Sequence, residues 1–232
     1  EKVKKSIRIK TMNLVALLYE KLLLRNIRGS PDKIPGHITL VLSDTDISYP
    51  DGISKLFSVI SWYRKLGIGI ISIYVNLSSI NETQNMNMVS HLMDTLEPRL
   101  LELPDGIGFE IYDNKGELKR VRKGSLMHVY LSLGFGGKSE ITNAVLSVLS
   151  DVSSQKLEPN DIDENVIESR LLVQHEPDMI IRAGGKNLSD FLIWQSVYSE
   201  LYFTDVNWDK VRKIDMIRAI RDFQKRQRKF GK

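Results

Sequence analysis

The sequence lacks cysteine altogether, and it also lacks any long apolar run. Without cysteine, the chain has no disulfide, thiolate zinc site, iron–sulfur cluster or cysteine nucleophile. No apolar run reaches the length of about 18 residues that a membrane-spanning helix needs. The most apolar early segment, Met12–Leu24, contains Glu20 and Lys21 and lacks a signal-peptide cleavage pattern. We therefore expect a cytoplasmic protein.

Metal-ligand spacing, internal repeats and low-complexity linkers are also missing from the sequence. No two of the histidines stand at a spacing typical of a metal site, so each is interpreted as structural. These histidines are His37, His91, His128 and His175. The chain of 232 residues is 42% hydrophobic and 27% charged, which indicates one globular domain with its own core.

The net charge of +4 is unevenly distributed, because basic residues gather near both ends of the chain. Such an excess fits an anionic partner: a nucleic acid, an anionic lipid or a phosphorylated ligand. Nucleic acid is the weakest of the three, since the basic C-terminal segment carries no helix-turn-helix or zinc-finger pattern. We divide the single domain of residues 1–232 into an N-terminal amphipathic helix region, 1–33, a central part, and a C-terminal helix and tail, 213–232.

Short β-branched runs alternate with helical patterns along the chain. The predicted strands are Ile38–Leu42, Ile68–Val75, Gly108–Tyr112, His128–Leu133, Met179–Arg182 and Leu201–Phe203. The predicted helices are Met12–Ile27, Ile53–Leu66, Met86–Leu101, Ser139–Ser153, Glu164–Val173, Asp190–Ser199 and Lys213–Lys229. This alternation predicts an α/β fold in which a mostly parallel, six-stranded sheet is flanked by helices. In such sheets ligands bind beyond the carboxyl ends of the strands.

Two glycine-containing segments follow predicted strands. Leu133–Ser139 ends in Gly-Lys-Ser, but Ser132 stands where a phosphate-binding loop needs its first glycine, so we interpret the segment as a tight turn. Arg182–Phe191 is more informative, because it combines a guanidinium, two glycines and a hydroxyl at a predicted helix start. Together these groups resemble a cradle for a diphosphate. Further along, Glu200 is an acid among apolar residues and needs a partner, a metal or solvent.

The segment from Arg182 to Trp208 closely resembles the C-terminal signature of the cis-prenyltransferases, the undecaprenyl diphosphate synthase family. The resemblance rests on Arg-Ala-Gly-Gly, Leu-Ser-Asp-Phe-Leu-Ile-Trp-Gln-Ser and Tyr-Ser-Glu-Leu-Tyr-Phe-Thr-Asp-Val-Asn-Trp within that segment. It extends to the Gly134–Ile141 turn, to Ile34–Val41 and to the closing Arg226–Gly231. The similar stretches are therefore spread over most of the chain.

The resemblance implies a dimer that joins isopentenyl diphosphate to an allylic diphosphate with Mg²⁺. It also implies that the C-terminal tail of each subunit reaches into its neighbour's site. The residues implied to bind isopentenyl diphosphate are Arg182, Gly184, Ser189, Arg228, Lys229, Phe230 and Gly231, and Glu200 is the implied metal ligand. Lys229 stands where the family has arginine, so the charge is kept but the bidentate fork is lost.

One departure from the family is as informative as the match. After the first strand the family carries Asp-Gly-Asn-Gly-Arg-Trp, where the aspartate assists diphosphate ionisation through Mg²⁺. The corresponding stretch here is Ser43–Asp51, with sequence Ser-Asp-Thr-Asp-Ile-Ser-Tyr-Pro-Asp, and it has neither glycine nor arginine. This stretch resembles the accessory subunits of heteromeric cis-prenyltransferases, the Nogo-B receptor type.

The sequence thus predicts a non-catalytic or weakly catalytic subunit of a heteromeric cis-prenyltransferase that makes long-chain polyprenyl diphosphate. Its partner would be a catalytic homologue, in a heterodimer or heterotetramer that pairs through the segment Asp190–Ser199 and the neighbouring strand. The first alternative is an active homodimeric enzyme that uses Asp44 or Asp46. A second alternative is a binding or receptor module without a role in transfer. The basic, amphipathic N-terminus is also compatible with peripheral association with an anionic membrane.

Overall fold

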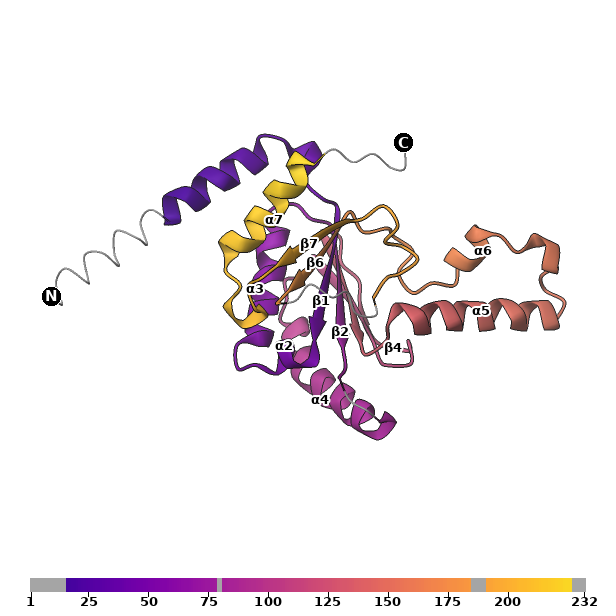
Figure 1. Ribbon diagram of the computed structural model, residues 1–232. Helices are drawn as coiled ribbons and strands as arrows, with labels where there is room; N and C mark the ends of the chain where they lie inside the picture. The colour runs from indigo at the N-terminus through magenta and orange to yellow at the C-terminus, as the bar shows by residue number, and fades with distance from the viewer. Residues whose placement is uncertain (1–15, 79–80, 185–190, 227–232) are drawn as a thin grey trace.

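A seven-stranded sheet forms the centre of the computed structural model, which describes residues 16–78, 81–184 and 191–226 (Figure 1). The strands are β1 His37–Ser43, β2 Ile70–Asn76, β3 Ile107–Tyr112, β4 Leu118–Arg122, β5 Met127–Leu133, β6 Met179–Ala183 and β7 Glu200–Thr204. Their order in the sheet is β4-β3-β5-β2-β1-β6-β7. Every neighbouring pair is parallel except β3 and β4. The predicted α/β fold is therefore confirmed, with seven strands in place of six.

The additional strand is β4, which forms a hairpin with β3. The turn between them is held by Asp113, whose Oδ1 accepts the backbone N–H groups of Lys115 and Glu117, at 2.9 Å each. The Lys119 Nζ then lies 2.8 Å from Asp113 Oδ2. Three of the five residues of β4 are basic, so the strand lacks the apolar run by which the other six were predicted.

The helices agree with the predictions at most positions. They comprise a helix over residues 16–28, α2 Asp44–Ser48, α3 Gly52–Arg64, α4 Glu82–Leu101, α5 Gly137–Ser153, α6 Glu164–Glu168 and α7 Lys213–Lys225. In the described part of the chain, short 3-10 turns occur at Pro31–Lys33, Pro159–Asp161 and Trp208–Lys210. Asp163 caps α6 by accepting the Val166 N–H at 2.9 Å. Gly67 has φ of 84° just after α3, the left-handed conformation that ends helices.

The predicted helix Asp190–Ser199 is wrong, because residues 191–199 form turns. Phe191 and Leu192 are buried against the sheet, and Gln195 is buried beside them. The Gln195 Nε2 donates to the Val173 carbonyl at 2.9 Å and lies 3.2 Å from Glu140 Oε1. These contacts with distant residues hold the segment in a non-helical conformation. Apolar periodicity alone therefore predicted the wrong structure.

Two further boundaries differ from the predictions. The helix predicted over Met86–Leu101 begins earlier, at Glu82, because the Asn81 side chain accepts the Gln84 N–H at 2.8 Å. The helix predicted over Glu164–Val173 ends at Glu168, and Val173 is instead buried in the core. The short helix α2 was not predicted.

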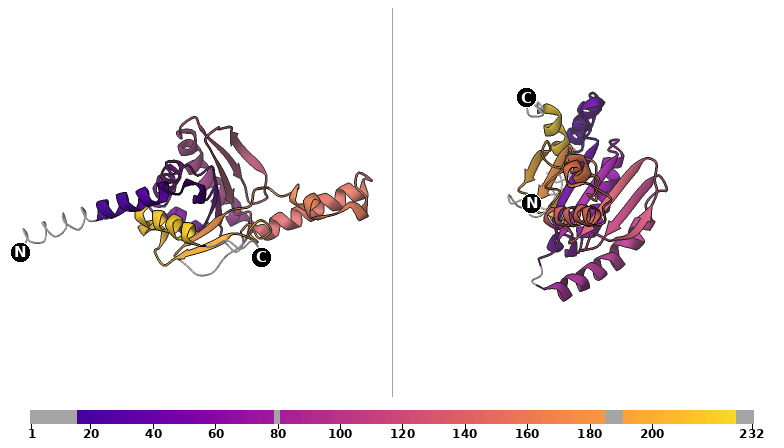
Figure 2. Two further views of the ribbon diagram at one scale, coloured as in Figure 1. Left: turned by 90° about the horizontal axis from the view of Figure 1, so that it is seen from above. Right: turned by 90° about the vertical axis from the view of Figure 1, so that its right-hand side faces the viewer.

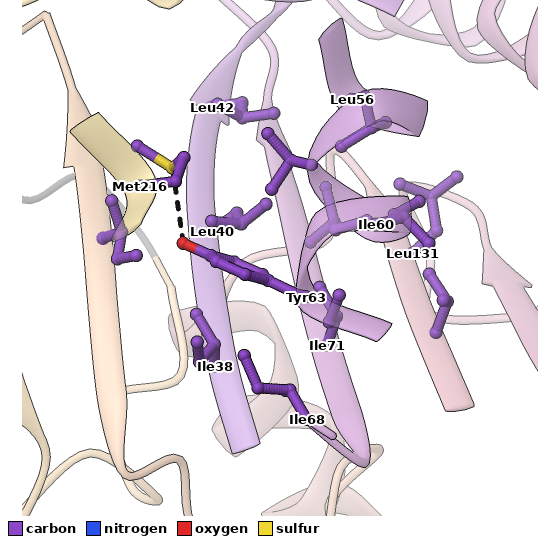
Figure 3. Packing of buried hydrophobic residues seen from close by; sticks show 14 of the residues in the cluster. Ile38, Leu40, Leu42, Leu56, Ile60, Tyr63, Ile68, Ile71, Leu131 and Met216 are labelled. Atoms are coloured by element: carbon purple, nitrogen blue, oxygen red, sulfur yellow. Dashed lines mark hydrogen bonds between the residues drawn. The ribbon is translucent and has the colours of Figure 1, made fainter. Parts of the chain in front are cut away.

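The main core lies between the sheet and the helices α3, α4 and α7. Figure 3 shows Tyr63 of α3 at its centre, among Ile38 and Leu40 of β1. The Tyr63 hydroxyl donates to the Met216 sulfur of α7 at 3.3 Å, so this buried polar group has a partner. Burial raises the pKa of Tyr63 far above its ordinary value, which keeps the hydroxyl protonated.

The other face of the sheet carries a smaller cluster, and α5 projects from it (Figures 1 and 2). Val41, Tyr74 and Ile180 on the strands pack against Val173, Phe191 and Leu192. Both faces are therefore covered, as expected for a parallel sheet. Within the described residues, no helix is long and apolar enough to cross a membrane.

Candidate functional site

The carboxyl ends of β1, β2 and β6 meet at one edge of the sheet. Ser43 at the end of β1 lies opposite Asn76 at the end of β2, and Val41 lies opposite Arg182 in β6. The segments that follow these strands were expected to carry the ligand site, and the topology brings them together. The candidate site consists of Asp44, Asp46, Ser78 and Arg182.

Arg182 is the cation of the site and is largely buried, with its side chain 17% exposed. Its Nη1 donates to the Val41 carbonyl at 3.0 Å and lies 3.6 Å from Asp46 Oδ2. The Nε of Arg182 is buried and has no hydrogen-bond partner among the described residues. A buried donor without a partner is costly, so this guanidinium retains capacity for an anionic oxygen.

Asp46 is occupied in holding the short helix α2. Its Oδ2 accepts from the Ser43 N–H at 2.8 Å and from the Ser43 hydroxyl at 2.7 Å. In return, the Ser43 Oγ accepts from the Asp46 N–H at 3.2 Å, which completes a capping box. The same carboxylate oxygen therefore serves as a cap and as the nearest anion to Arg182.

Asp44 is buried and joins the ends of β1 and β2. Its Oδ1 accepts from the Thr45 N–H at 2.7 Å and from the Ser78 hydroxyl at 2.9 Å, and its Oδ2 accepts from the Ser78 N–H at 2.9 Å. Ser78 was not singled out from the sequence, although it lies in the segment after the second strand. Its partner is 34 residues away, so only the parallel pairing of β1 and β2 connects them.

The carboxylates do not form a ready metal site. No cluster of three or more histidine, aspartate or glutamate side chains with metal-binding geometry occurs among the described residues. Asp44 accepts three hydrogen bonds and Asp46 two from Ser43, so both acids are engaged within the chain. The described residues therefore do not fit Mg²⁺ on their own, because a magnesium ion demands free oxygen ligands in near-octahedral geometry.

The glycine turns have distinct structural roles. Gly184 has φ of 71° and its N–H donates to the Thr204 carbonyl at 3.0 Å, so it turns the chain at the end of β6. Gly137 begins α5, and a Cβ there would lie 1.9 Å from the Phe191 carbonyl oxygen. The Gly134–Ser139 segment is therefore a tight strand-to-helix turn, as interpreted from the sequence, against which residues 191–193 pack closely.

Glu200 lies away from Arg182. It begins β7 opposite Met179, whereas Arg182 lies opposite Phe203, so the two are at opposite ends of their strands. The Glu200 Oε2 accepts from the Arg226 Nη1 at 2.6 Å. This ion pair supplies the partner that an acid among apolar residues needs. The metal role assigned to Glu200 stays a prediction, and within one chain the structure does not bring it to Arg182.

Several predicted site residues lie outside the described residues. These are Ser189 in the cradle and Arg228, Lys229, Phe230 and Gly231 in the tail. Their assignment to isopentenyl diphosphate stays a prediction.

The histidines are held by the sheet, in agreement with a structural role for two of them. The His37 Nε2 lies 2.8 Å from the Ser72 hydroxyl, and burial lowers the pKa of His37 to about 4. The His128 Nε2 lies 3.2 Å from Glu110 Oε1, and partial burial also lowers the pKa of His128. Both imidazoles belong to the amino-terminal half of their strands, away from Arg182.

Comparison with known proteins assigns the chain to a family. The family model described as "Putative undecaprenyl diphosphate synthase" matches residues 110–231. The chain is 31% identical to a tritrans,polycis-undecaprenyl-diphosphate synthase (geranylgeranyl-diphosphate specific) of Methanocaldococcus jannaschii, over 94% of this chain and 89% of that protein. It is 31% identical to an isoprenyl transferase of Thermus thermophilus, over 93% of this chain and 95% of that protein.

Solved structures agree in fold. The lavandulyl diphosphate synthase of Lavandula x intermedia, in complex with dimethylallyl diphosphate, superposes with a TM-score of 0.71 at 23% identity, covering 87% of this chain and 100% of that one. A probable undecaprenyl diphosphate synthase of Campylobacter jejuni gives 0.68 at 21% identity, covering 85% and 99%. Neither of the two relatives nor the two solved structures is named as an accessory subunit. The matches along nearly the whole chain show that it belongs to the cis-prenyltransferase family of undecaprenyl diphosphate synthases.

Proposed function

We propose that this chain acts in the synthesis of polyprenyl diphosphate, the elongation of an allylic diphosphate by isopentenyl diphosphate. Family membership and the names of the relatives support this activity. The observation that carries it is Arg182, a largely buried guanidinium at the carboxyl ends of the strands, whose Nε has no hydrogen-bond partner among the described residues. A guanidinium with free donors binds phosphate oxygens well, because the hydrogen bonds are charge-assisted.

Arg182 would bind the diphosphate of isopentenyl diphosphate and hold it in place while the new bond forms. The Val41 carbonyl fixes the guanidinium by accepting from Nη1 at 3.0 Å. Mg²⁺ bound to the allylic diphosphate would supply charge neutralisation. The described residues do not complete a magnesium site, so the remaining ligands would come from substrate oxygens or from a partner chain.

Two roles within this activity remain to be separated. The two relatives named above favour an active enzyme. They are named as a synthase and a transferase, and this chain matches nearly their whole length. In that role Asp44 or Asp46 would be the acid that assists ionisation. This is the role that the comparisons support better.

The contacts of the site favour the other role, a subunit that depends on a catalytic homologue. Ser43 stands where the family's Asp-Gly-Asn-Gly-Arg-Trp motif begins with its aspartate. Asp44 and Asp46 therefore lie one and three positions after the place of that aspartate. Asp44 and Asp46 are then both engaged in hydrogen bonds within the chain. The stretch Ser43–Asp51 contains no arginine to hold the allylic diphosphate. On this geometry we favour the subunit, which would supply its phosphate cradle and its C-terminal tail to the partner.

Reconstitution tests the two roles directly. The chain is purified alone and together with a homologue that carries the intact family motif, and incorporation of labelled isopentenyl diphosphate is measured with farnesyl and geranylgeranyl diphosphate as primers. A subunit gives no product alone, co-purifies with the homologue and raises its activity. Elongation by the purified chain alone would establish the active enzyme.

Substitution of the two acids provides an independent readout. In a subunit, Asp44→Asn and Asp46→Asn leave the kcat of the complex within about twofold, because neither acid touches the reacting atoms, whereas loss of the Asp46 charge beside Arg182 changes the KM for isopentenyl diphosphate. In an enzyme, loss of the ionising acid lowers kcat by about a hundredfold or more. Asp161→Asn, an exposed acid in a turn near α6, is the matched control and changes neither. Circular dichroism confirms that each variant folds.

The tail prediction separates both roles from a binding module without a part in transfer. Lys229→Ala and Gly231→Ala are introduced into whichever assembly is active. A catalytic contribution of the tail raises the KM for isopentenyl diphosphate or lowers kcat. If neither constant changes, the tail takes no part in the reaction and the binding module gains support.

A further inference from the structure

The outward face of the N-terminal helix is unusually apolar for an exposed surface. Leu17, Leu18 and Leu22 are 56%, 59% and 54% exposed, although the helix already buries Leu23 and Ile27 on its inner side. The inner side attaches the helix to the domain through an ion pair of Glu20 with Lys213, at 2.5 Å. The exposed leucines are therefore not needed to hold the helix in place.

Cations surround these leucines. Lys21, Arg25 and Arg28 lie on the exposed side of the same helix and line a shallow hollow with Leu24 and Gly29. A second hollow lies between this helix and α7, and it is lined by Tyr19, Leu23, Asn26, Tyr202, Arg218, Arg221, Asp222 and Lys225. Figures 1 and 2 show the N-terminal helix beside α7 at one side of the sheet, running outward from the domain. Lys21, Arg25 and Arg28 thus share the exposed side of the helix with the leucines, and the basic residues of α7 line the adjoining hollow on the Leu23 side.

We propose that this face is a docking surface for an anionic lipid bilayer. The three leucines would enter the boundary between headgroups and acyl chains, and the flanking cations would contact phosphate groups at the level of the headgroups. Exposed leucine next to lysine and arginine on one helix is the chemistry of helices that lie in the plane of a membrane interface. The arginine and lysine side chains that line the hollows favour lipids with a net negative charge over zwitterionic lipids. The proposal is independent of whether the chain is an enzyme or a subunit.

A flotation assay tests the proposal. The full chain is mixed with vesicles of phosphatidylcholine alone or with about one third phosphatidylglycerol, and the bound fraction is measured at low and high salt. We expect binding to the anionic vesicles only, with a marked decrease at high salt, because salt screens the contribution of the cations. Equal binding to both kinds of vesicle, or to neither, would overturn the proposal.

Two pairs of substitutions assign binding to this face. Lys21→Gln with Arg25→Gln should weaken binding about fivefold for each charge removed, which corresponds to the roughly 1 kcal/mol that each basic residue contributes near an anionic surface. Leu18→Gln with Leu22→Gln should weaken it about tenfold or more. All four side chains are exposed, so the variants retain the fold, which circular dichroism confirms.

Leu146→Gln with Leu149→Gln is the matched control, because these leucines of α5 are 59% and 53% exposed on a different face. The control should bind like the unchanged chain. If it loses binding as strongly as the N-terminal pair, the membrane contact is not specific to this face and the proposal fails. Light scattering can instead show a dimer that only Leu18→Gln with Leu22→Gln dissociates, while the chain binds no vesicles. In that case the face is a protein interface and the proposal is equally wrong.

Discussion

His37 makes the stability of this protein depend on pH in a defined direction. It begins β1 at 4% exposure, and its Nε2 lies 2.8 Å from the Ser72 hydroxyl. Burial lowers the pKa of His37 from 6.5 to about 4, and the backbone of Glu176 and the charge of Asp178 offset only part of that effect. The folded protein therefore holds this imidazole neutral at pH values where the unfolded chain protonates it.

Between pH 6.5 and 4 the unfolded state thus binds more protons than the folded state. The contribution of His37 to stability is fully present above about pH 6.5 and is lost as the pH falls towards 4. Linkage gives a decrease in the free energy of unfolding of about 2 kcal/mol at pH 5 and about 3 kcal/mol at pH 4, for a pKa that changes from 6.5 to about 4.

Urea unfolding followed by tryptophan fluorescence at pH 7, 6 and 5 measures this loss. His37→Gln is the informative variant, because glutamine does not titrate and retains an amide that can reach Ser72. The variant should lose about 2 kcal/mol of the pH dependence between pH 7 and 5, whatever its stability at pH 7. His128, whose pKa is also lowered by burial, should account for part of the remaining slope. If unchanged protein and variant show parallel profiles, the reasoning is refuted.

Three further substitutions test the site and its supports. Arg182→Gln should raise the KM for isopentenyl diphosphate by about tenfold to a hundredfold in the active assembly, because a charge-assisted hydrogen bond contributes roughly 1.5–3 kcal/mol. Steady-state kinetics measures this KM, with Arg182→Lys as the comparison variant, and an unchanged KM contradicts the prediction. Gly137→Ala places a Cβ 1.9 Å from the Phe191 carbonyl oxygen and should lower the melting temperature measurably. Gly67→Asn should lower it less, because nothing lies within 4 Å of the added Cβ and asparagine adopts a positive φ more readily than other side chains. Trp208→Phe removes the 3.0 Å hydrogen bond from Trp208 Nε1 to the Gly52 carbonyl and should cost about 2–4 kcal/mol of unfolding free energy in urea titration; a loss below 1 kcal/mol would contradict that reasoning.

The sheet could be predicted where apolar runs carry the signal. Ile70–Asn76 and Met179–Ala183 are buried on both faces, so their β-branched residues stand out in the sequence. Leu118–Arg122 is an edge strand paired only with β3, and three of its five residues are basic, of which Arg120 is exposed. Charged residues are typical of edge strands because they discourage pairing with other chains, and the same property hides such a strand from hydrophobic patterns.

The turn at 191–199 shows a different limit. Its apolar spacing is typical of a helix, but the Gln195 amide bonds to Val173 and lies close to Glu140, residues that are 22 and 55 positions away. The candidate site has the same character. Arg182 could be singled out from the sequence because its neighbours are glycines, whereas the engagement of Asp44 by Ser78 depends on the pairing of β1 with β2. Contacts between distant segments decided both cases.

The contact between Arg182 and Asp46 links two ends of the site energetically. Asp46 Oδ2 caps α2 and also lies 3.6 Å from the Arg182 guanidinium, so an anion that draws the guanidinium away leaves that carboxylate without its nearest cation. The coupling is reciprocal: whatever loosens the cap at Ser43 alters the affinity of Arg182 for anions by the same factor as anion binding alters the cap. The stretch Ser43–Asp51 after β1, which lacks the family's glycines, is thereby coupled to anion binding at Arg182 in β6.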